Sequence, residues 1–275
     1  MILAALLLSG CANSVGTAND IASNDAVATG ETAATEKPTQ FDPMEGLEVK
    51  PTQAPTEPPT LDDLAKAKYN KILKKKKANH AQLKNVTALN QMNGMQAGCE
   101  ALALTAALSH FGYDLDINNI VDNYLVYSDN FVTGYCGNPR RFYDGAGIYP
   151  PGMVKTTWNF IKKNDAELYP FDTTGLSMDK LYKFVKAGCP ILIWTTYDRS
   201  SPYIEQTTEY NGISYPWYAS EHCVCLVGYD LESSQVLVAD SWGGYVDWED
   251  AGRFESIYDE VGQFSMVLMD VSDLK

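Results

Sequence analysis

Residues 98–108 read Gly-Cys-Glu-Ala-Leu-Ala-Leu-Thr-Ala-Ala-Leu, an apolar run that predicts a buried helix with Cys99 in its first turn. A thiol at that position faces backbone N–H groups without partners and the positive end of the helix dipole, and both favour thiolate over thiol. We expect the helix to reach His110 and to stop at Gly112, a typical C-terminal cap. The position favours a nucleophilic Cys99 over the alternative of a small apolar packing residue.

A histidine and an aspartate far downstream can complete this chemistry. His222 opens one strand-like stretch, and Asp240 closes the next. A hairpin of the two strands brings these ends together, so that Asp240 can hold Nδ1–H of the imidazole and leave Nε2 for the thiol. His80 and His110 are the only other histidines, and His110 lies too far along the Cys99 helix to exchange a proton with the thiol.

Helices are predicted mostly in the first part of the chain and strands in the second, an order typical of an α+β fold. The helices are expected over 62–79, 99–110, 118–127, 153–164 and 178–187, and the strands over 191–197, 222–229, 235–240 and 264–271. Residues 128–153 and 198–219 are interpreted as long irregular loops. The sequence therefore predicts N-terminal helices, with the nucleophile at a helix N-terminus, packed on a C-terminal antiparallel sheet.

Three segments together resemble a known family. They are Gln91 with Cys99-Glu100, then Glu221-His222-Cys223-Val224-Cys225-Leu226-Val227-Gly228-Tyr229-Asp230, then Val238-Ala239-Asp240. They are similar to the papain-like bacterial cysteine peptidase-like family related to the double-glycine-leader peptidases, which process bacteriocins. The resemblance covers about residues 84–272 and implies a papain-like fold.

By this resemblance Cys99 is the nucleophile, His222 the general base and Asp240 the residue that orients the base. Gln91 supplies a donor to the oxyanion hole, and Gln96 is the alternative donor.

The walls of a substrate cleft are expected from the aromatic loops and from the residues around the cysteine. The candidates are Gly98, Tyr149, Trp217 and Trp242. No metal or other cofactor is expected, because His222, Cys223 and Cys225 lack a fourth ligand nearby in the sequence.

The first sixty residues have the composition of an anchor and a tether. Residues 1–11 are apolar, too short to span a bilayer, and end in Leu8-Ser9-Gly10-Cys11, which resembles a lipobox with Cys11 as the lipidated residue. Residues 12–60 are rich in Thr, Pro, Ala and acidic residues and are predicted to be a disordered linker. We therefore expect the protein at the extracytoplasmic face of a bacterial cell membrane, held by a lipid on Cys11.

Charge separates a basic segment from an acidic body. Residues 61–83 are predicted to be helical and are rich in lysine, whereas from residue 89 onward 25 acidic residues outnumber 11 basic ones. Residues 84–275 are expected to form the peptidase domain. The negative charge of this body argues against nucleic acid as a partner and is compatible with a cationic peptide.

These observations predict a lipid-anchored thiol hydrolase that cleaves amide or peptide bonds through a Cys-His-Asp triad and an acyl-enzyme intermediate. The expected partner is a peptide or a cell-wall peptide, and the protein is expected to be a monomer. Two alternatives stay open, namely an inactive papain-like module for binding or adhesion at the cell surface, and an acyltransferase with the same triad. For Cys136 and Cys189, a disulfide and two buried thiols both stay open.

Overall fold

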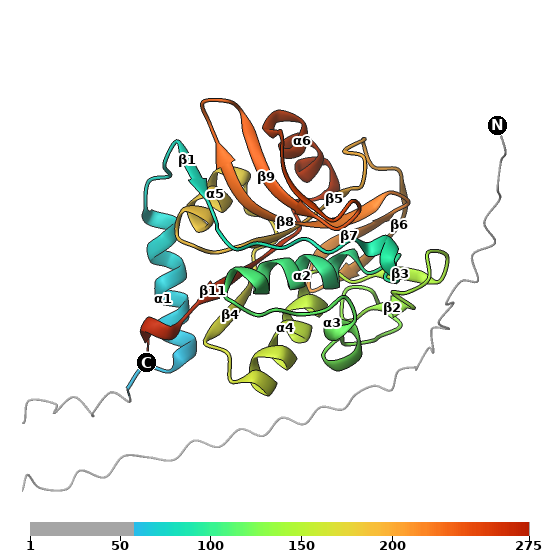
Figure 1. The fold of residues 1–275 in the computed structure, drawn as a ribbon, viewed down its shortest axis with the longest axis horizontal. Helices are drawn as coiled ribbons and strands as arrows, with labels where there is room; N and C mark the ends of the chain where they lie inside the picture. The colour runs from blue at the N-terminus through green and yellow to red at the C-terminus, as the bar shows by residue number, and fades with distance from the viewer. Residues whose placement is uncertain (1–57, 275) are drawn as a thin grey trace, which may run out of the picture. The chain divides into compact units, whose positions relative to one another are not determined.

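A seven-stranded antiparallel sheet lies at the centre of residues 58–274, the part of the chain that the computed structural model describes (Figure 1). The strand order is β10-β9-β8-β5-β11-β4, and β1 pairs with the last residues of β8. The strands are β1 (His80–Gln82), β4 (Leu168–Asp172), β5 (Ile191–Thr196), β8 (Glu221–Asp230), β9 (Gln235–Asp240), β10 (Tyr245–Asp250) and β11 (Ser265–Asp270). The predicted α+β fold with an antiparallel sheet is confirmed.

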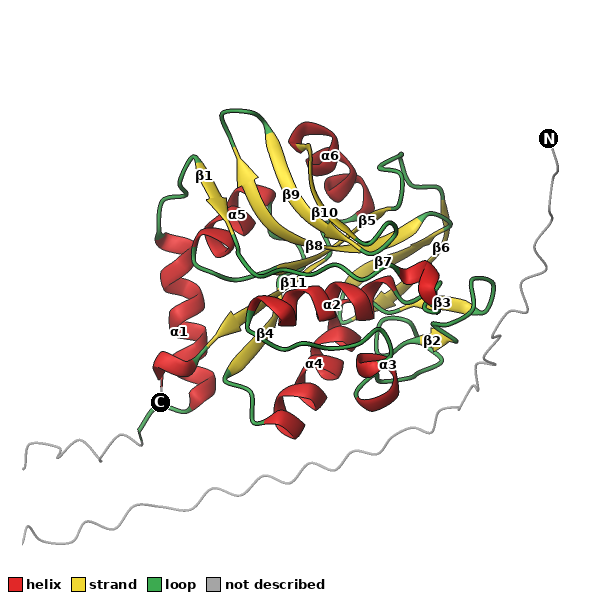
Figure 2. Ribbon diagram, viewed as in Figure 1, coloured by secondary structure: helices red, strands yellow, loops and turns green. Residues whose placement is uncertain are grey.

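Helices cover both faces of the sheet, and Figure 2 shows α2, α3 and α4 on one side and α5 and α6 on the other. The helices are α1 (Leu61–Lys74), α2 (Cys99–His110), α3 (Asn119–Asn123), α4 (Pro150–Asn164), α5 (Met178–Lys186) and α6 (Ala251–Val261), with 3₁₀ turns η1 (Gln91–Asn93) and η2 (Ser272–Leu274). Helix α2 packs against β8 and β5. This contact places the helix N-terminus beside the first residues of β8.

Helix α2 is buried around its whole circumference. Residues 99–108 are all buried, because alanine and leucine occupy nearly every position and leave no polar face for solvent. The predicted helix from Cys99 to His110 is confirmed. Gly112 follows it at φ 88°, a left-handed conformation that glycine adopts readily.

Several helix boundaries differ from the prediction for local reasons. The helix predicted over 62–79 ends at Lys74, where a run of four lysines begins and like charges disfavour further helical turns. The helix predicted over 118–127 is only the five-residue α3. The helix predicted over 153–164 begins earlier, at Pro150, because a proline in the first turn sacrifices no helical hydrogen bond.

The prediction of an irregular loop over 198–219 is wrong. It contains a hairpin of β6 (Ile204–Tyr210) and β7 (Ile213–Tyr218), which forms a small sheet of its own. The turn is Asn211-Gly212 with left-handed φ values of 50° and 75°, as a two-residue hairpin turn requires. Strand β6 is mostly exposed on both faces, so its sequence lacks the alternation that marks a half-buried strand.

Other elements also lie where the sequence predicts none. The loop predicted over 128–153 contains the short pair β2 (Cys136–Gly137) and β3 (Gly145–Gly147). The structure also contains strands β1, β4 and β10 and helix α6, which the sequence analysis does not predict.

The lysine-rich segment packs on the same compact unit as the rest of the described residues. Ala65 and Ile72 of α1 are buried, and Lys68 forms an ion pair with Asp273. The predicted lipobox with Cys11, and the predicted linker up to residue 57, lie outside the described residues. Within residues 58–274 no helix has the length and apolar character needed to cross a membrane.

Candidate active site

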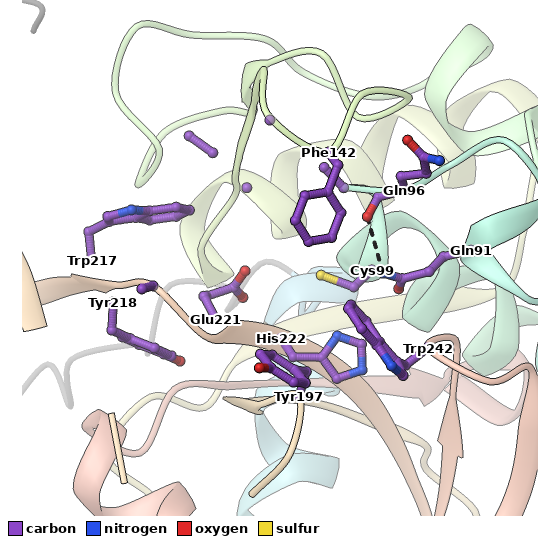
Figure 3. A pocket seen from close by; sticks show the side chains of 15 residues that line it. Gln91, Gln96, Cys99, Phe142, Tyr197, Trp217, Tyr218, Glu221, His222 and Trp242 are labelled. Atoms are coloured by element: carbon purple, nitrogen blue, oxygen red, sulfur yellow. Dashed lines mark hydrogen bonds between the residues drawn. The ribbon is translucent and has the colours of Figure 1, made fainter. Parts of the chain in front are cut away.

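A cavity of about 140 Å³ opens where the N-terminus of α2 meets the start of β8 (Figure 3). Its lining includes five of the residues predicted for the site, namely Gln91, Cys99, Trp217, His222 and Trp242. They come from η1, α2, β7, β8 and the turn after β9, which the fold brings to one place.

His222 and Asp240 form a buried pair at this cavity. Nε2 of His222 lies 2.7 Å from Oδ1 of Asp240, and each residue is 1% exposed. The contact forms because His222 is the second residue of β8 and Asp240 ends its antiparallel neighbour β9. One detail of the prediction is corrected, since Asp240 holds Nε2 and leaves Nδ1 as the nitrogen that can take a proton from a thiol.

Asp240 is held as a carboxylate by three partners. Oδ1 also accepts from the Trp242 N–H at 2.8 Å, and Oδ2 accepts from Nη2 of Arg199 at 3.1 Å. Burial alone would raise the pKa of Asp240, but the hydrogen bond and charge of His222, with smaller effects of Trp242 and Arg199, lower that pKa to about 2. Asp240 is therefore ionised at neutral pH and can stabilise an imidazolium.

Arg199 is a site residue that the sequence analysis misses. Its buried guanidinium donates to Asp240, to both carboxylate oxygens of Glu249 at 2.7 and 2.8 Å, and to the Thr196 carbonyl at 2.7 Å. Its backbone has a left-handed φ of 56°, in a turn just after β5. The only signal in the sequence is a single arginine within a segment interpreted as a loop, which is too weak to assign a contact.

Gln91 is fixed beside Cys99 by the residue that follows Asp240. Ser241 Oγ donates to Oε1 of Gln91 at 2.8 Å, and the Gln91 backbone N–H donates to the Ser241 carbonyl at 2.8 Å. Nε2 of Gln91 donates to the Gln96 carbonyl at 3.2 Å, and an amide nitrogen carries a second hydrogen for another acceptor. Figure 3 shows the Gln91 side chain next to Cys99 and the Gln96 side chain directed away. This arrangement favours Gln91 over Gln96 as an oxyanion donor.

Cys99 is the first residue of α2, as predicted, but its surroundings oppose the expected thiolate. Sγ donates to Oε2 of Glu100 at 3.4 Å, and no hydrogen bond to His222 is found within residues 58–274. Burial raises the pKa of the thiol well above its usual value, and the charges of Glu100 and Glu221 raise it further. A hydrogen bond from the Cys223 backbone acts in the opposite direction. Cys99 therefore rests as a thiol, and the expected low pKa is wrong for this state.

Two carboxyl groups that are absent from the predicted site flank the thiol. Glu100 is fully buried, and its Oε1 accepts from the Ile148 N–H at 2.7 Å. Glu221 lines the cavity, and its Oε1 is buried with no hydrogen-bond partner among the described residues. Burial raises the pKa of Glu100 to about 7, and burial together with Glu100 raises the pKa of Glu221 well above its usual value. Each carboxylate directly adjoins a predicted catalytic residue in the sequence, which is the signal that could have identified them.

Aromatic rings form much of the cavity wall. Trp242 stacks on Tyr197 with ring centroids 4.9 Å apart and lies roughly perpendicular to the His222 ring at 6.1 Å. Trp217 contributes from the opposite side of Cys99 in Figure 3. The two tryptophans of the predicted cleft therefore lie at the cavity.

The other two predicted cleft residues do not line it. Tyr149 is fully buried, stacks on Trp194 and donates to the Pro216 carbonyl, so it belongs to the core. Gly98 is the N-cap of α2, and a Cβ there would overlap the Met95 side chain. The prediction that these two residues line the cleft is therefore wrong: Tyr149 is a core residue, and Gly98 is the N-cap of the helix that carries Cys99.

The remaining candidates lie away from the cavity. His80 pairs with Asp230 at 3.6 Å, and His110 bonds to a backbone carbonyl. Cys136 and Cys189 are not joined by a disulfide, so the first of their two alternatives is wrong; Cys189 is buried, as the second alternative predicts, whereas Cys136 is only partly buried.

Comparison with known proteins identifies the family of this chain. A model of the Peptidase_C39 like family matches residues 83–266. The chain belongs to this family. This confirms the resemblance inferred from the sequence, and the fold is the papain-like one that the resemblance implies.

One curated sequence and two solved structures are among the proteins similar to this chain. "Uncharacterized protein YvpB" of Bacillus subtilis (strain 168) is 24% identical over 200 residues, which cover 71% of this chain and 79% of the relative. A solved structure from Bacillus anthracis, assigned as a C39-like peptidase, has a TM-score of 0.58 at 26% identity and covers 69% of this chain and 97% of that one. Xylellain, a cysteine protease from Xylella fastidiosa, is 14% identical with a TM-score of 0.39, over 73% of this chain and 89% of that one.

Replacing Glu100 with Gln should activate the thiol. The substitution keeps an oxygen for the Ile148 N–H but removes a negative charge beside Sγ, so the pKa of Cys99 falls and the thiolate fraction at pH 8 rises. We expect alkylation of Cys99 by iodoacetamide to be about tenfold faster, the effect of a one-unit change in pKa. Mass spectrometry of each cysteine measures the rate, and Glu209→Gln, an exposed carboxylate on β6, is the control. A slower reaction would instead identify Glu100 as the base that activates the thiol.

Replacing Arg199 with Met should destabilise the protein and weaken the hold on Asp240. It leaves two carboxylates without their buried partner, which costs about 3 kcal/mol of the free energy of unfolding at neutral pH. The lowered pKa of Asp240 means that its stabilising effect is present above about pH 4 and is lost as the pH falls towards 2. Without Arg199 the pKa of Asp240 rises, so acid unfolding should begin at a higher pH.

Urea unfolding at several pH values tests this. The control is Arg141→Met, which removes an exposed pair with Asp144 and should cost no more than about 1 kcal/mol. Equal losses in the two variants would contradict a structural role for the buried arginine.

Proposed function

We propose that this protein is a thiol peptidase or amidase, in which Cys99 attacks an amide carbonyl and forms an acyl-enzyme that water resolves. The family and the fold point to a cysteine peptidase-like protein. One observation carries the proposal further, because Cys99 and His222 line the same cavity and His222 is backed by the buried, ionised Asp240.

Proton transfer accompanies the attack, since Cys99 rests as a thiol. The thiol turns from Glu100 and gives its proton to Nδ1 of His222, while Asp240 stabilises the imidazolium through Nε2. Glu100 is a competing acceptor, because a carboxylate with a pKa of about 7 suits general-base catalysis and already receives the S–H hydrogen bond. The Glu100→Gln rate distinguishes the two bases.

The negative charge that develops on the carbonyl oxygen lies at the N-terminus of α2. The first N–H groups of a helix have no partner inside it, and Gly98 has no side chain to cap them. The Cys99 N–H and the second hydrogen of the Gln91 amide are therefore the proposed donors. Ser241 positions the amide that supplies the second donor.

The surroundings of this reaction are proposed from the sequence. A lipid on Cys11 would hold a monomer at the extracytoplasmic face, with a peptide or a cell-wall peptide as the substrate. The acyltransferase alternative uses the same acyl-enzyme with an amine in place of water. The binding-module alternative is disfavoured, because a nucleophile, a base, an orienting carboxylate and an oxyanion donor all gather at one cavity.

Digestion of a mixed-sequence peptide library, read by mass spectrometry, tests the proposal. We expect Cys99→Ala and His222→Ala to lower cleavage by about 10³-fold or more, and Gln91→Ala by about 10²-fold. His110→Ala should keep the wild-type rate, because His110 lies away from the cavity. A competing amine in the reaction separates transfer from hydrolysis. Absence of cleavage together with absence of an acyl adduct on Cys99 would favour the binding module.

A further inference from the structure

One wall of the cavity brings a carboxyl group and an indole together. A Cβ placed on Gly147 would lie 2.4 Å from Oε1 of Glu100, 3.3 Å from Oε2 of Glu221 and 3.5 Å from the ring of Trp217. Because position 147 is glycine with a φ of 81°, it places no side chain of its own between the Glu221 carboxyl and the Trp217 ring. Figure 3 shows the Glu221 carboxyl between the Trp217 indole and the Cys99 sulfur.

The carboxyl groups at this wall have no counterion in the described structure. Oε1 of Glu221 is buried and unpartnered, and no lysine or arginine lines the cavity. A second carboxyl, that of Glu100, lies close enough to raise the pKa of Glu221. Buried polar atoms nearly always have a partner, so an orphaned carboxylate oxygen in a cavity wall indicates a group that binds there.

We propose that Glu221, with Trp217 beside it, binds a cationic group of the substrate next to the amide that Cys99 attacks. The group is an ammonium or a guanidinium, carried by a lysine or arginine side chain or by the amino terminus of a peptide. A cation bound beside Glu221 favours the ionised form of its carboxyl group. The carboxylate then supplies a charge-assisted hydrogen bond, and the indole supplies a cation–π contact. This inference rests on the proposed peptidase function and adds a substrate class to it.

A metal ion is the competing occupant of the same place. Cys99, Glu100 and Glu221 each offer one ligand atom, and these atoms lie within 4.8 Å of one another. A metal bound there would take the sulfur that the proposed reaction needs, whereas an organic cation on Glu221 leaves it free. The neighbouring indole and the net charge of −14 also favour a cationic peptide.

Charge-selective labelling of Cys99 tests the inference without a known substrate. The probes are 2-aminoethyl and 2-hydroxyethyl methanethiosulfonate, one cationic and one neutral. In both, the Cys99 thiolate attacks the reagent sulfur, a mixed disulfide forms and methanesulfinate leaves. The ratio of the two rates, divided by the same ratio for a small free thiol, cancels any change in the pKa of Cys99.

We expect this normalised ratio to be about tenfold or more in the full-length protein with a chelator present, as one charge-assisted contact would give. Glu221→Gln should reduce the ratio to near one, while the control Glu209→Gln should leave it unchanged. An equal ratio in the wild type and in Glu221→Gln would overturn the inference. Protection of Cys99 by Zn²⁺ that depends on Glu221, without any charge selectivity, would assign the site to a metal and also overturn it.

Matched peptides test the same contact during turnover. Lysine is compared with norleucine, arginine with citrulline, and a free amino terminus with an acetylated one. We expect kcat/KM for the cationic member to be about tenfold higher, and Glu221→Gln to remove that preference while sparing the neutral member. Equal cleavage of both members would overturn the inference of a cation site but not the proposed peptidase function. Charge-selective labelling without cleavage of any peptide would support the cation site and overturn the proposed function.

Discussion

A carboxylate that is removed from water needs a hydrogen bond or charge on each side, and Asp240 obtains them from His222, Trp242 and Arg199. Each partner then fixes another part of the site. His222 is oriented with Nε2 on Asp240, which leaves Nδ1 for the thiol proton. The Trp242 backbone is fixed with its ring edge-on to the imidazole, and Arg199 joins the turn after β5 to β10 through Glu249. The next residue, Ser241, holds Gln91. The end of one strand therefore positions the base, a cavity wall and the proposed oxyanion donor.

The two sides of the cavity treat carboxyl groups in opposite ways. Beside the imidazole, cationic and N–H partners keep Asp240 charged in spite of its burial. Beside the thiol, Glu221 has an oxygen without a partner among the described residues, Glu100 raises the pKa of Glu221, and both carboxyl groups raise the pKa of Cys99. Two environments that push carboxyl pKa values apart are a common arrangement where acid and base roles are divided. Here the division places the fixed charge behind the base and the titratable charge beside the nucleophile.

Sequence patterns predict those parts of the site that depend on regular structure. Cys99 could be placed at a helix start because residues 98–108 are mostly apolar, and the contact between His222 and Asp240 follows from strand ends. Such patterns do not indicate side-chain rotamers, so the sequence analysis assigned the wrong nitrogen of His222 to the contact with Asp240. The raised pKa of Cys99 depends on burial beside two acids, and the Arg199 contact depends on a left-handed turn, neither of which a local pattern reveals. The hairpin of β6 and β7 was not predicted, because its strands alternate in neither burial nor polarity. Its Asn211-Gly212 pair is nevertheless typical of a two-residue hairpin turn.

The hydrogen bond between Gln91 and Ser241 joins residues that are 150 positions apart in the chain. During synthesis the thiol of Cys99 therefore leaves the ribosome long before the strands that carry its base and the clamp on Gln91. Contacts of such sequence separation form late, because the intervening loop must be closed before they contribute any energy. A growing or truncated chain thus contains Cys99 but lacks the base and the serine that positions Gln91. The topology itself delays any chemistry at Cys99 until the last strands have docked.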